Sequence, residues 1–335
     1  MMLFYLTILF SATISFITTF FLTKKFIVYL KNIGMIGYDI NKKDKREVAE
    51  MGGPPVIFGF LLGLYIFIAF LVFGLSQRNV SDILASALTI TTISFIAMFD
   101  DLTALMKKRG LKRKGLRQRH KFLLPLPAAI PLMAVKAGCS VVYLPLIGAL
   151  NLGVLYPLFV IPIAIMGASN ATNMLAGLNG LEAGLGIIAI FSLGVFALTH
   201  SQYITFAIAI CFVASLLAFL YFNKYPAKIF PGDSLTYAIG ATIAVLAILG
   251  NMEKYALFIF IPWFLEFFLK ARTKFKGESF GKVDEKGNLK PIHGKIESLT
   301  HLPMVLFKNC SEKKAVYFLY LVEMVICLLG FVLLK

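Results

Sequence analysis

Two adjacent carboxylates, Asp100 and Asp101, close an apolar run and are followed by nine Lys and Arg residues before the next apolar run begins. Two like charges side by side repel each other unless a cation or a proton lies between them. Mg²⁺ is bound in proteins through one or two carboxylates together with phosphate oxygens of the substrate. The stretch therefore predicts metal-assisted phosphate chemistry, with simple solvation of a helix end as the alternative.

A second polar segment, ASNATNMLAGLNGLEAG at residues 168–184, combines three Asn residues with several Gly residues. Amide oxygens of Asn170, Asn173 and Asn179 can ligate a hard cation or a substrate. Glycine at position 177 would let the backbone approach a nucleotide closely. The alternative is an ordinary turn rich in Gly and Asn.

A third carboxylate, Asp233, follows Pro231 and Gly232 and precedes Ser234. Alone, it is typical of a helix N-cap. Together with the two motifs above, it is predicted to be a metal ligand.

Basic residues supply candidate phosphate contacts. Lys121 either neutralises a transferring phosphate or pairs with one of the aspartates, and the run from Arg119 to Lys121 could instead contact lipid head groups. Arg272, Lys274 and Lys276 alternate along the chain and either clamp a diphosphate or form an interfacial belt. His293 and His301 have no partner motif and are interpreted as hydrogen-bonded loop histidines.

The composition indicates what kind of scaffold carries these residues. The 335-residue chain is 59% hydrophobic and 15% charged, whereas soluble domains are roughly 45–50% apolar. We expect one all-α, polytopic membrane domain over residues 1–335, with ten membrane-spanning helices. The apolar runs are 2–23, 54–75, 83–99, 122–136, 154–168, 183–199, 203–222, 235–250, 255–269 and 315–334.

Charge placement predicts the orientation of these spans. With the N-terminus outside, the predicted inside loops are 24–50, 100–121, 168–183, 223–233 and 270–314. These loops hold 29 of the 33 Lys and Arg residues, in agreement with the positive-inside rule. All the polar motifs then fall on the cytoplasmic side, which predicts a single active site there. Segment 137–153 is expected to form a short outside hairpin, and 270–314 a structured loop.

The net charge of +16 and the four cysteines limit the function classes. Because the charge lies in loops between apolar runs, anionic membrane lipids are the expected partners, and nucleic acid is not. Cys139, Cys211, Cys310 and Cys327 are scattered, so neither a zinc site nor a disulfide framework is predicted. The first apolar run is expected to be retained as a helix.

Three phrases together resemble one enzyme family. RHKFLLP (119–125), NATNMLAGLNGLEAG (170–184) and PGDS (231–234) are similar to motifs of the polyprenyl-phosphate N-acetylhexosamine-1-phosphate transferases, of the glycosyltransferase 4 type. The resemblance covers roughly residues 35–300 and is closest to the archaeal and eukaryotic dolichyl-phosphate GlcNAc-1-phosphotransferases. It implies an integral enzyme of the cell membrane, with a cytoplasmic site, that transfers a sugar-1-phosphate from a UDP-sugar to polyprenyl or dolichyl phosphate and releases UMP. A homodimer is left open.

The resemblance also implies roles for individual residues. Asn173 and Asp233 match the Mg²⁺ ligands, with Mn²⁺ as an alternative metal, and Asp100 and Asp101 match the paired catalytic aspartates. Lys121 matches the lysine near the substrate phosphates. The positions that match residues around the nucleotide are Glu50, Gly177, Asn179 and Phe230.

The sequence departs from the family in the last predicted inside loop. The bacterial HxHH motif and the eukaryotic PRHR phrase are both absent, and the plausible substitutes are Arg272, Lys274, Lys276 and Glu278. Transfer of GlcNAc-1-phosphate for N-glycosylation is the leading hypothesis. Transfer from another UDP-sugar into a cell-surface glycan is the alternative, and a non-catalytic transporter is a third.

Overall fold

The computed structural model describes residues 2–42, 44, 46–77, 80–108, 118–144 and 148–334, without the side chains of 104–108, 118–120, 143 and 144. Within these residues, seven helices are long and apolar enough to cross a membrane. They are α1 (Met2–Asn32), α2 (Gly53–Ala69, extended by the π-helical turn Phe70–Gly74), α3 (Ser81–Lys108), α7 (Leu181–Thr199), α8 (Tyr203–Asn223), α9 (Gly232–Leu249) and α13 (Glu312–Leu333). The chain is a multi-pass integral membrane protein.

The other three predicted spans are interrupted helices. Run 122–136 forms α4 (Gln118–Leu123), a 3₁₀ turn (Leu126–Ala129) and α5 (Ile130–Ala134). Run 154–168 forms a π-helical turn (Tyr156–Val160) and the start of α6 (Ile161–Met174), and run 255–269 forms α10 (Glu253–Ile259) and α11 (Ile261–Arg272). Each run contains proline, which lacks the N–H that a continuous helix needs.

Helix α9 is the centre of the bundle, and it packs against α2, α3, α6 and α7. Small residues allow the helix backbones to come close together. A Cβ atom on Gly240 of α9 would lie 2.3 Å from the carbonyl oxygen of Ala168 on α6. This contact fixes α6 against α9, and both helices carry candidate site residues.

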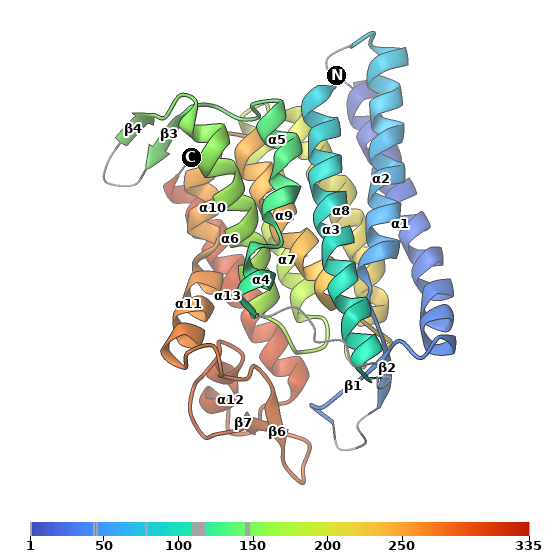
Figure 1. Cartoon of the computed structure of the whole chain (residues 1–335), viewed down its shortest axis with the longest axis vertical. Coiled ribbons are helices and arrows are strands. Elements are labelled where there is room, and N and C mark those ends of the chain that lie inside the picture. Colours follow the sequence, from blue (N-terminus) through green and yellow to red (C-terminus); the bar gives the residue numbers. More distant parts are fainter. Residues whose placement is uncertain are drawn as a thin grey trace.

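The two ends of the bundle differ in what they carry (Figure 1). The chain termini lie at one end with the antiparallel hairpin of β3 (Val141–Leu144) and β4 (Gly148–Asn151), so the predicted hairpin within 137–153 is confirmed. The opposite end holds β1 (Ile36–Tyr38), β2 (Glu47–Glu50), the hairpin of β6 (Gly281–Val283) and β7 (Leu289–Pro291), and α12 (His301–Leu306). Segment 270–314 is therefore structured, as predicted.

A small sheet at this second end joins distant parts of the chain. Strand β2 pairs with β1 in antiparallel fashion and with β5 (Ile229–Phe230) in parallel fashion. The parallel pairing places Glu50 opposite Phe230. Strand β5 leads directly into α9, so the sheet sets the position at which α9 begins.

Candidate active site

Three charged residues predicted from the sequence meet where α3, α4 and α9 come together. The Lys121 ammonium pairs with the Asp100 carboxylate and lies 3.9 Å from Oδ2 of Asp233. Asp100 is buried, whereas the side chains of Lys121 and Asp233 are 35% and 27% exposed. The cluster is therefore a cation held between two carboxylates at an accessible position, and the predicted pairing of Lys121 with an aspartate is present.

The boundaries 100–121 predicted that the aspartate pair begins a loop, but the pair lies within a helix. Helix α3 continues to Lys108, so Asp100 and Asp101 lie inside the helix, two turns before its end. The residues between Asp101 and Lys108 include no Gly or Pro, and Leu, Ala, Met and Lys favour helix. Of the predicted inside loop 100–121, residues 109–117 lie outside the described residues, as do the side chains of Arg119 and His120.

Asp101 caps helix α9. Its Oδ1 accepts a hydrogen bond from the backbone N–H of Asp233 at 2.9 Å, and its Oδ2 accepts one from Ser234 at 3.1 Å. The first N–H groups of a helix have no partner within the helix, and a carboxylate also complements the positive end of the helix dipole. Asp101 therefore fixes α9 against α3.

Asp233 is not the N-cap residue of α9, so the N-cap role considered for it from the sequence is excluded. It lies in the first turn, after Pro231 at the N-cap position and Gly232. Gly232 has φ +68°, and a Cβ there would lie 2.8 Å from Oδ2 of Asp101. Glycine at this position allows the chain to turn around the Asp101 carboxylate and leaves the Asp233 side chain directed towards Lys121.

Asn173 and Asn170 join α6 to this site. The Thr236 hydroxyl, one helical turn after Asp233, donates to Oδ1 of Asn173 at 2.8 Å. The Asn170 amide donates to the carbonyl of Phe122, the residue after Lys121, at 3.0 Å. Both asparagines therefore lie close to the charged cluster, on the face of α6 that packs against α9.

The Gly-rich segment 175–180 is held by carboxylates that the sequence reading did not single out. The Gly177 N–H donates to Glu182 at 2.8 Å, and the Asn179 N–H donates to Glu312 at 2.7 Å. The Asn179 amide donates to Asp39 at 2.9 Å. Glu182 could have been noticed as a lone carboxylate within an apolar stretch, but Asp39 and Glu312 are far from this segment in sequence.

Glu50 and Phe230 are brought together by the small sheet. A Cβ on Gly37 of β1 would lie 3.0 Å from Oε2 of Glu50 and 3.2 Å from the Phe230 ring. Glycine at position 37 therefore leaves room for both side chains. This pair was predicted only from the resemblance, and the strand pairing explains why two residues separated by 180 positions can act together.

Within the described ranges, the basic residues at the end of α11 and just after it make no bond to the charged cluster. Arg272 donates to the carbonyl of Ile296 within its own loop, and Lys274 has a left-handed backbone with φ +54°. Lys274 and Lys276 are exposed. Among the residues that the structure describes, no bond joins these three side chains to Asp100, Lys121 or Asp233.

His293 and His301 are both hydrogen-bonded within the loop, as interpreted from the sequence. The His293 ring lies 3.1 Å from Oε2 of Glu297. The two ring nitrogens of His301 bond to backbone groups of Phe280 and Glu297. The described part of the chain contains no cluster of three or more His, Cys, Asp or Glu that could hold a metal, and the four cysteines are free.

An apolar cavity of about 570 Å³ runs between α6, α9, α10 and α11. Its walls are almost entirely Ala, Ile, Leu, Val, Phe and Trp side chains, including Ile243, Trp263 and Phe264. Phe122 and Asn170 also line it. Since Phe122 follows Lys121, the cavity begins beside the charged cluster and extends along the bundle.

Comparison with known proteins places the chain in a family. The model of glycosyl transferase family 4 matches residues 83–251, which include the charged cluster and Asn173. A protein of Saccharolobus solfataricus named as a UDP-N-acetylglucosamine–dolichyl-phosphate N-acetylglucosaminephosphotransferase is 38% identical over 98% of this chain and 96% of its own. The enzyme of that name from Saccharomyces cerevisiae is 30% identical over 73% of this chain and 62% of its own.

A bacterial branch of similar proteins is also found. The phospho-N-acetylmuramoyl-pentapeptide-transferase of Shouchella clausii is 31% identical over 74% of this chain and 76% of its own. The resemblance drawn from the three sequence phrases is confirmed, and the chain belongs to glycosyl transferase family 4.

Proposed function

We propose that the protein transfers GlcNAc-1-phosphate from UDP-GlcNAc to a polyprenyl or dolichyl phosphate, as the first step of lipid-linked oligosaccharide assembly for protein N-glycosylation. The observation that carries this proposal is the Asp100–Lys121–Asp233 cluster close to an apolar cavity, which the neighbouring Phe122 helps to line. A phosphate attached to a long hydrocarbon chain needs a charged site for the phosphate and an apolar site for the chain. The names of the archaeal and yeast relatives support the same reaction.

The lipid carrier is assigned to the cavity between α6 and α11. The cavity is apolar over nearly all of its lining, which suits a prenyl chain because such a chain carries no polar group that would need a hydrogen-bond partner there. Phe122 and Asn170 lie at the end next to Lys121. A carrier bound this way presents its phosphate to the Lys121 ammonium.

The reaction exchanges one phosphorus–oxygen bond for another. An oxygen of the carrier phosphate forms a bond to the β-phosphorus of UDP-GlcNAc, and the bond from that phosphorus to the α–β bridging oxygen breaks. UMP leaves with the electron pair, and a GlcNAc-diphospho-lipid remains. A phosphate monoester with a second pKa of about 6 is already largely ionised at neutral pH, so positioning by Asp100 and Lys121 contributes more than proton removal.

The residues around Asp233 fit a hard divalent cation. Carboxylate and amide oxygens are the donors that Mg²⁺ accepts, and it normally takes its remaining ligands from water and substrate phosphates. Asp233 and Asn173 lie on packed helices and are linked through Thr236. Lys121 already provides a positive charge between the carboxylates. Bound Mg²⁺ would neutralise the diphosphate and stabilise its developing charge.

The site is assigned to the cytoplasmic side. The loops at the end that carries β1, β2 and the β6–β7 hairpin hold most of the Lys and Arg residues, and such loops favour the cytoplasm. With both termini at the opposite end, the number of crossings is even. Taking each of the interrupted helices of runs 122–136, 154–168 and 255–269 as one crossing, in addition to the seven long helices, supports the proposal of ten crossings.

Transfer of radiolabel tests the function directly. Purified protein in lipid or detergent is supplied with a polyprenyl phosphate, Mg²⁺ and UDP-GlcNAc labelled in the sugar, and the lipid product is identified by mass spectrometry. We expect the label and one additional phosphate to appear in the lipid fraction. Absence of a labelled diphospho-lipid with folded wild-type protein would refute the proposal.

A metal test separates the ligand assignment from the overall function. Chelation by EDTA should abolish transfer, and added Mg²⁺ should restore it. Asp233→Ala should lose activity that excess Mg²⁺ does not restore, whereas the exposed Asp82→Ala at the start of α3 should behave like wild type. Unchanged activity of the Asp233→Ala variant would overturn the metal assignment.

Another UDP-sugar remains the second candidate donor. The observation that favours it is the departure of loop 270–314 from the HxHH and PRHR motifs of the family. Competition of unlabelled UDP-sugars against labelled UDP-GlcNAc distinguishes the two, because the true donor should inhibit at the lowest concentration.

A further inference from the structure

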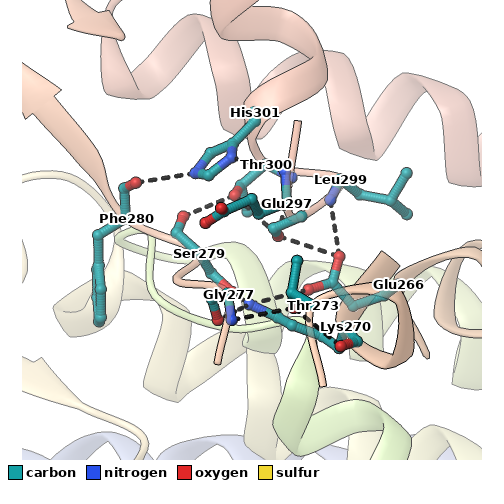
Figure 2. Close-up of polar contacts among 11 residues, drawn as sticks. Glu266, Lys270, Thr273, Gly277, Ser279, Phe280, Glu297, Leu299, Thr300 and His301 are labelled. Atoms are coloured by element: carbon teal, nitrogen blue, oxygen red, sulfur yellow. Dashed lines mark hydrogen bonds and ion pairs between the residues drawn. The ribbon is translucent and has the colours of Figure 1, made fainter. Parts of the chain in front are cut away.

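A buried ion pair on α11 holds the loop that follows it (Figure 2). Glu266 and Lys270 lie one helical turn apart and are 0% and 7% exposed. The Lys270 ammonium lies 3.5 Å from Oε1 of Glu266 and donates to the carbonyl of Gly277 at 2.9 Å and to the Ser279 hydroxyl at 2.7 Å. The ammonium therefore has two hydrogen-bond acceptors in the loop, and it meets Oε1 of Glu266 as an ion pair.

The same pair also holds the distal end of the loop. The second oxygen of Glu266 accepts hydrogen bonds from the Ser298 hydroxyl at 3.0 Å and from the Leu299 N–H at 2.7 Å. Segments 277–279 and 298–299 are thereby attached to one turn of α11. A buried ion pair adds little net stability compared with apolar residues, and its best explanation is that it specifies one arrangement.

Two further side chains fix the backbone of residues 279 and 280. The Thr300 hydroxyl donates to the carbonyl of Ser279 at 2.6 Å. His301 Nε2 lies 2.9 Å from the carbonyl of Phe280, and its Nδ1 accepts the Glu297 N–H at 3.2 Å. Figure 2 shows these bonds around one short piece of chain, which ends at Phe280.

Phe280 and its neighbour reach the Gly-rich segment of the candidate site. A Cβ on Gly177 would lie 2.9 Å from Cε1 of the Phe280 ring, so the ring packs directly on this backbone turn. Asn41 joins the two segments, because its amide donates to the carbonyl of Gly177 at 2.8 Å and its oxygen accepts the Gly281 N–H at 3.1 Å. The ion pair on α11 is thus connected to Gly177 through Phe280 and Asn41.

We propose that Phe280 forms part of the nucleotide-binding surface beside Gly177, and that Asn41, Glu266 and Lys270 are positioning residues that hold it there. The inference rests on the proposed function, since the ligand is the uridine diphosphate part of the donor. Phe280 is only partly buried, and an aromatic ring next to a close backbone turn offers an apolar surface to a nucleobase. In this interpretation, the buried pair of Glu266 and Lys270 holds the Phe280 ring in one position.

Steady-state kinetics with two varied substrates test the proposal. Phe280→Ala should raise the KM for UDP-GlcNAc roughly tenfold through loss of an aromatic contact, with the KM for the lipid phosphate and kcat within about threefold of wild type. Phe280→Tyr should restore the wild-type KM. Phe275→Ala removes an exposed ring of the same loop that contacts Phe267, and serves as the matched control with no change.

The positioning residues are tested by removing both charges together. The double variant Glu266→Leu, Lys270→Met leaves no unpaired buried charge, and should raise the KM for UDP-GlcNAc as Phe280→Ala does. Asn41→Ala should shift the same constant. An unchanged KM in a folded double variant, or an equal rise in the KM for both substrates after Phe280→Ala, would overturn the proposal.

Hydrogen exchange of the wild-type protein provides a reading that does not depend on variant folding or on the donor sugar. Added UMP should slow exchange of the amides in segments 277–281 and 175–180. UMP protection without GlcNAc transfer refutes the proposed donor while supporting the nucleotide surface. Transfer without UMP protection of segment 277–281 overturns the role of Phe280 and leaves the proposed function intact.

Discussion

At the scale of single residues, the two adjacent aspartates have different surroundings. Successive side chains on a helix point about 100° apart, so Asp100 faces Lys121 while Asp101 faces the start of α9. Only one of the two carboxylates therefore contacts the lysine of the site. The other determines where Asp233 lies.

Removal of the Asp101 carboxylate tests this division. Asp101→Ala should destabilise the protein by about 1 kcal/mol, the usual cost of losing a helix cap. It should also raise the Mg²⁺ concentration needed for half-maximal activity, because Asp233 is no longer held. Thermal unfolding in detergent and Mg²⁺ titration measure the two effects, with Asp82→Ala as control. Wild-type behaviour in both would contradict the capping role.

Lys121 is predicted to act through its charge and its geometry. Lys121→Met leaves Asp100 and Asp233 facing the substrate phosphates without a cation, and kcat should fall by roughly a hundredfold or more. Lys121→Arg keeps the charge and should retain part of the activity. Initial rates at saturating substrates measure both variants. A methionine variant within about threefold of wild type would exclude this role.

The sequence predicted the members of the charged cluster and offered the pairing of Lys121 with an aspartate, but it did not predict the contacts around Asn179. The residue types and their positions at the ends of apolar runs identified Asp100, Lys121 and Asp233 as candidates. The contacts of Asp39 and Glu312 with Asn179 depend on segments more than 130 positions apart. No local pattern in the sequence carries that information.

At the scale of elements, the long apolar helices followed directly from the sequence, and the short ones did not. Run 255–269 reads as one hydrophobic segment, yet it is divided into α10 and α11 at Phe260, just before Pro262. The strands β2 and β5 are four and two residues long and pair across the chain. Such short strands have too little periodicity to be predicted locally.

The loop after α11 is predicted to loosen in acid. Burial lowers the pKa of His301 from its ordinary value of 6.5, with Lys270 also lowering it and Glu297 opposing. Because the folded loop favours the neutral ring, the contribution of His301 to stability is complete above pH 6.5 and is lost as the pH falls below that value. Protonation of Nδ1 also removes the acceptor of the Glu297 N–H.

Hydrogen exchange of residues 277–301 measures this effect. After correction for intrinsic exchange, protection should decrease between about pH 6.5 and 5. His301→Gln keeps a donor and an acceptor without titrating, and should flatten the pH dependence. His200→Gln, outside this loop, is the control. A variant with the wild-type pH profile would show that His301 is not responsible.

At the scale of the whole molecule, the end of the bundle whose loops hold most of the Lys and Arg residues is also the end that carries the candidate site. The end that carries the termini and the β3–β4 hairpin is opposite the end that carries the candidate site and the β6–β7 hairpin (Figure 1). The orientation predicted from Lys and Arg counts assigns the second end to the cytoplasm. Composition predicts this orientation because membrane insertion responds to the charge of the loops and not to how the helices pack.

Cysteine labelling tests the orientation. In a background with Cys139→Ser, Asn151→Cys in the β3–β4 hairpin should react with a membrane-impermeant maleimide in intact cells. Lys286→Cys, between β6 and β7, should react only after the membrane is permeabilised. The reverse pattern would overturn the cytoplasmic assignment of the site.

The basic loop after α3 is predicted to orient the protein rather than to react. Lys112, Arg113 and Lys114 lie outside the described residues. Neutralising all three together should leave turnover within about twofold, because many other Lys and Arg residues remain on the same side. A large loss of kcat in correctly inserted protein would instead assign this loop to the phosphate site.

The Asp101 cap has a consequence for the protein in different lipids. Helices of a membrane protein tilt when the hydrocarbon layer becomes thicker or thinner. Because Asp101 on α3 is bonded to the first N–H groups of α9, the two helices are joined at the level of the site. Tilting displaces Asp100 and Asp233 together, so the distance between them does not change with the length of the surrounding acyl chains.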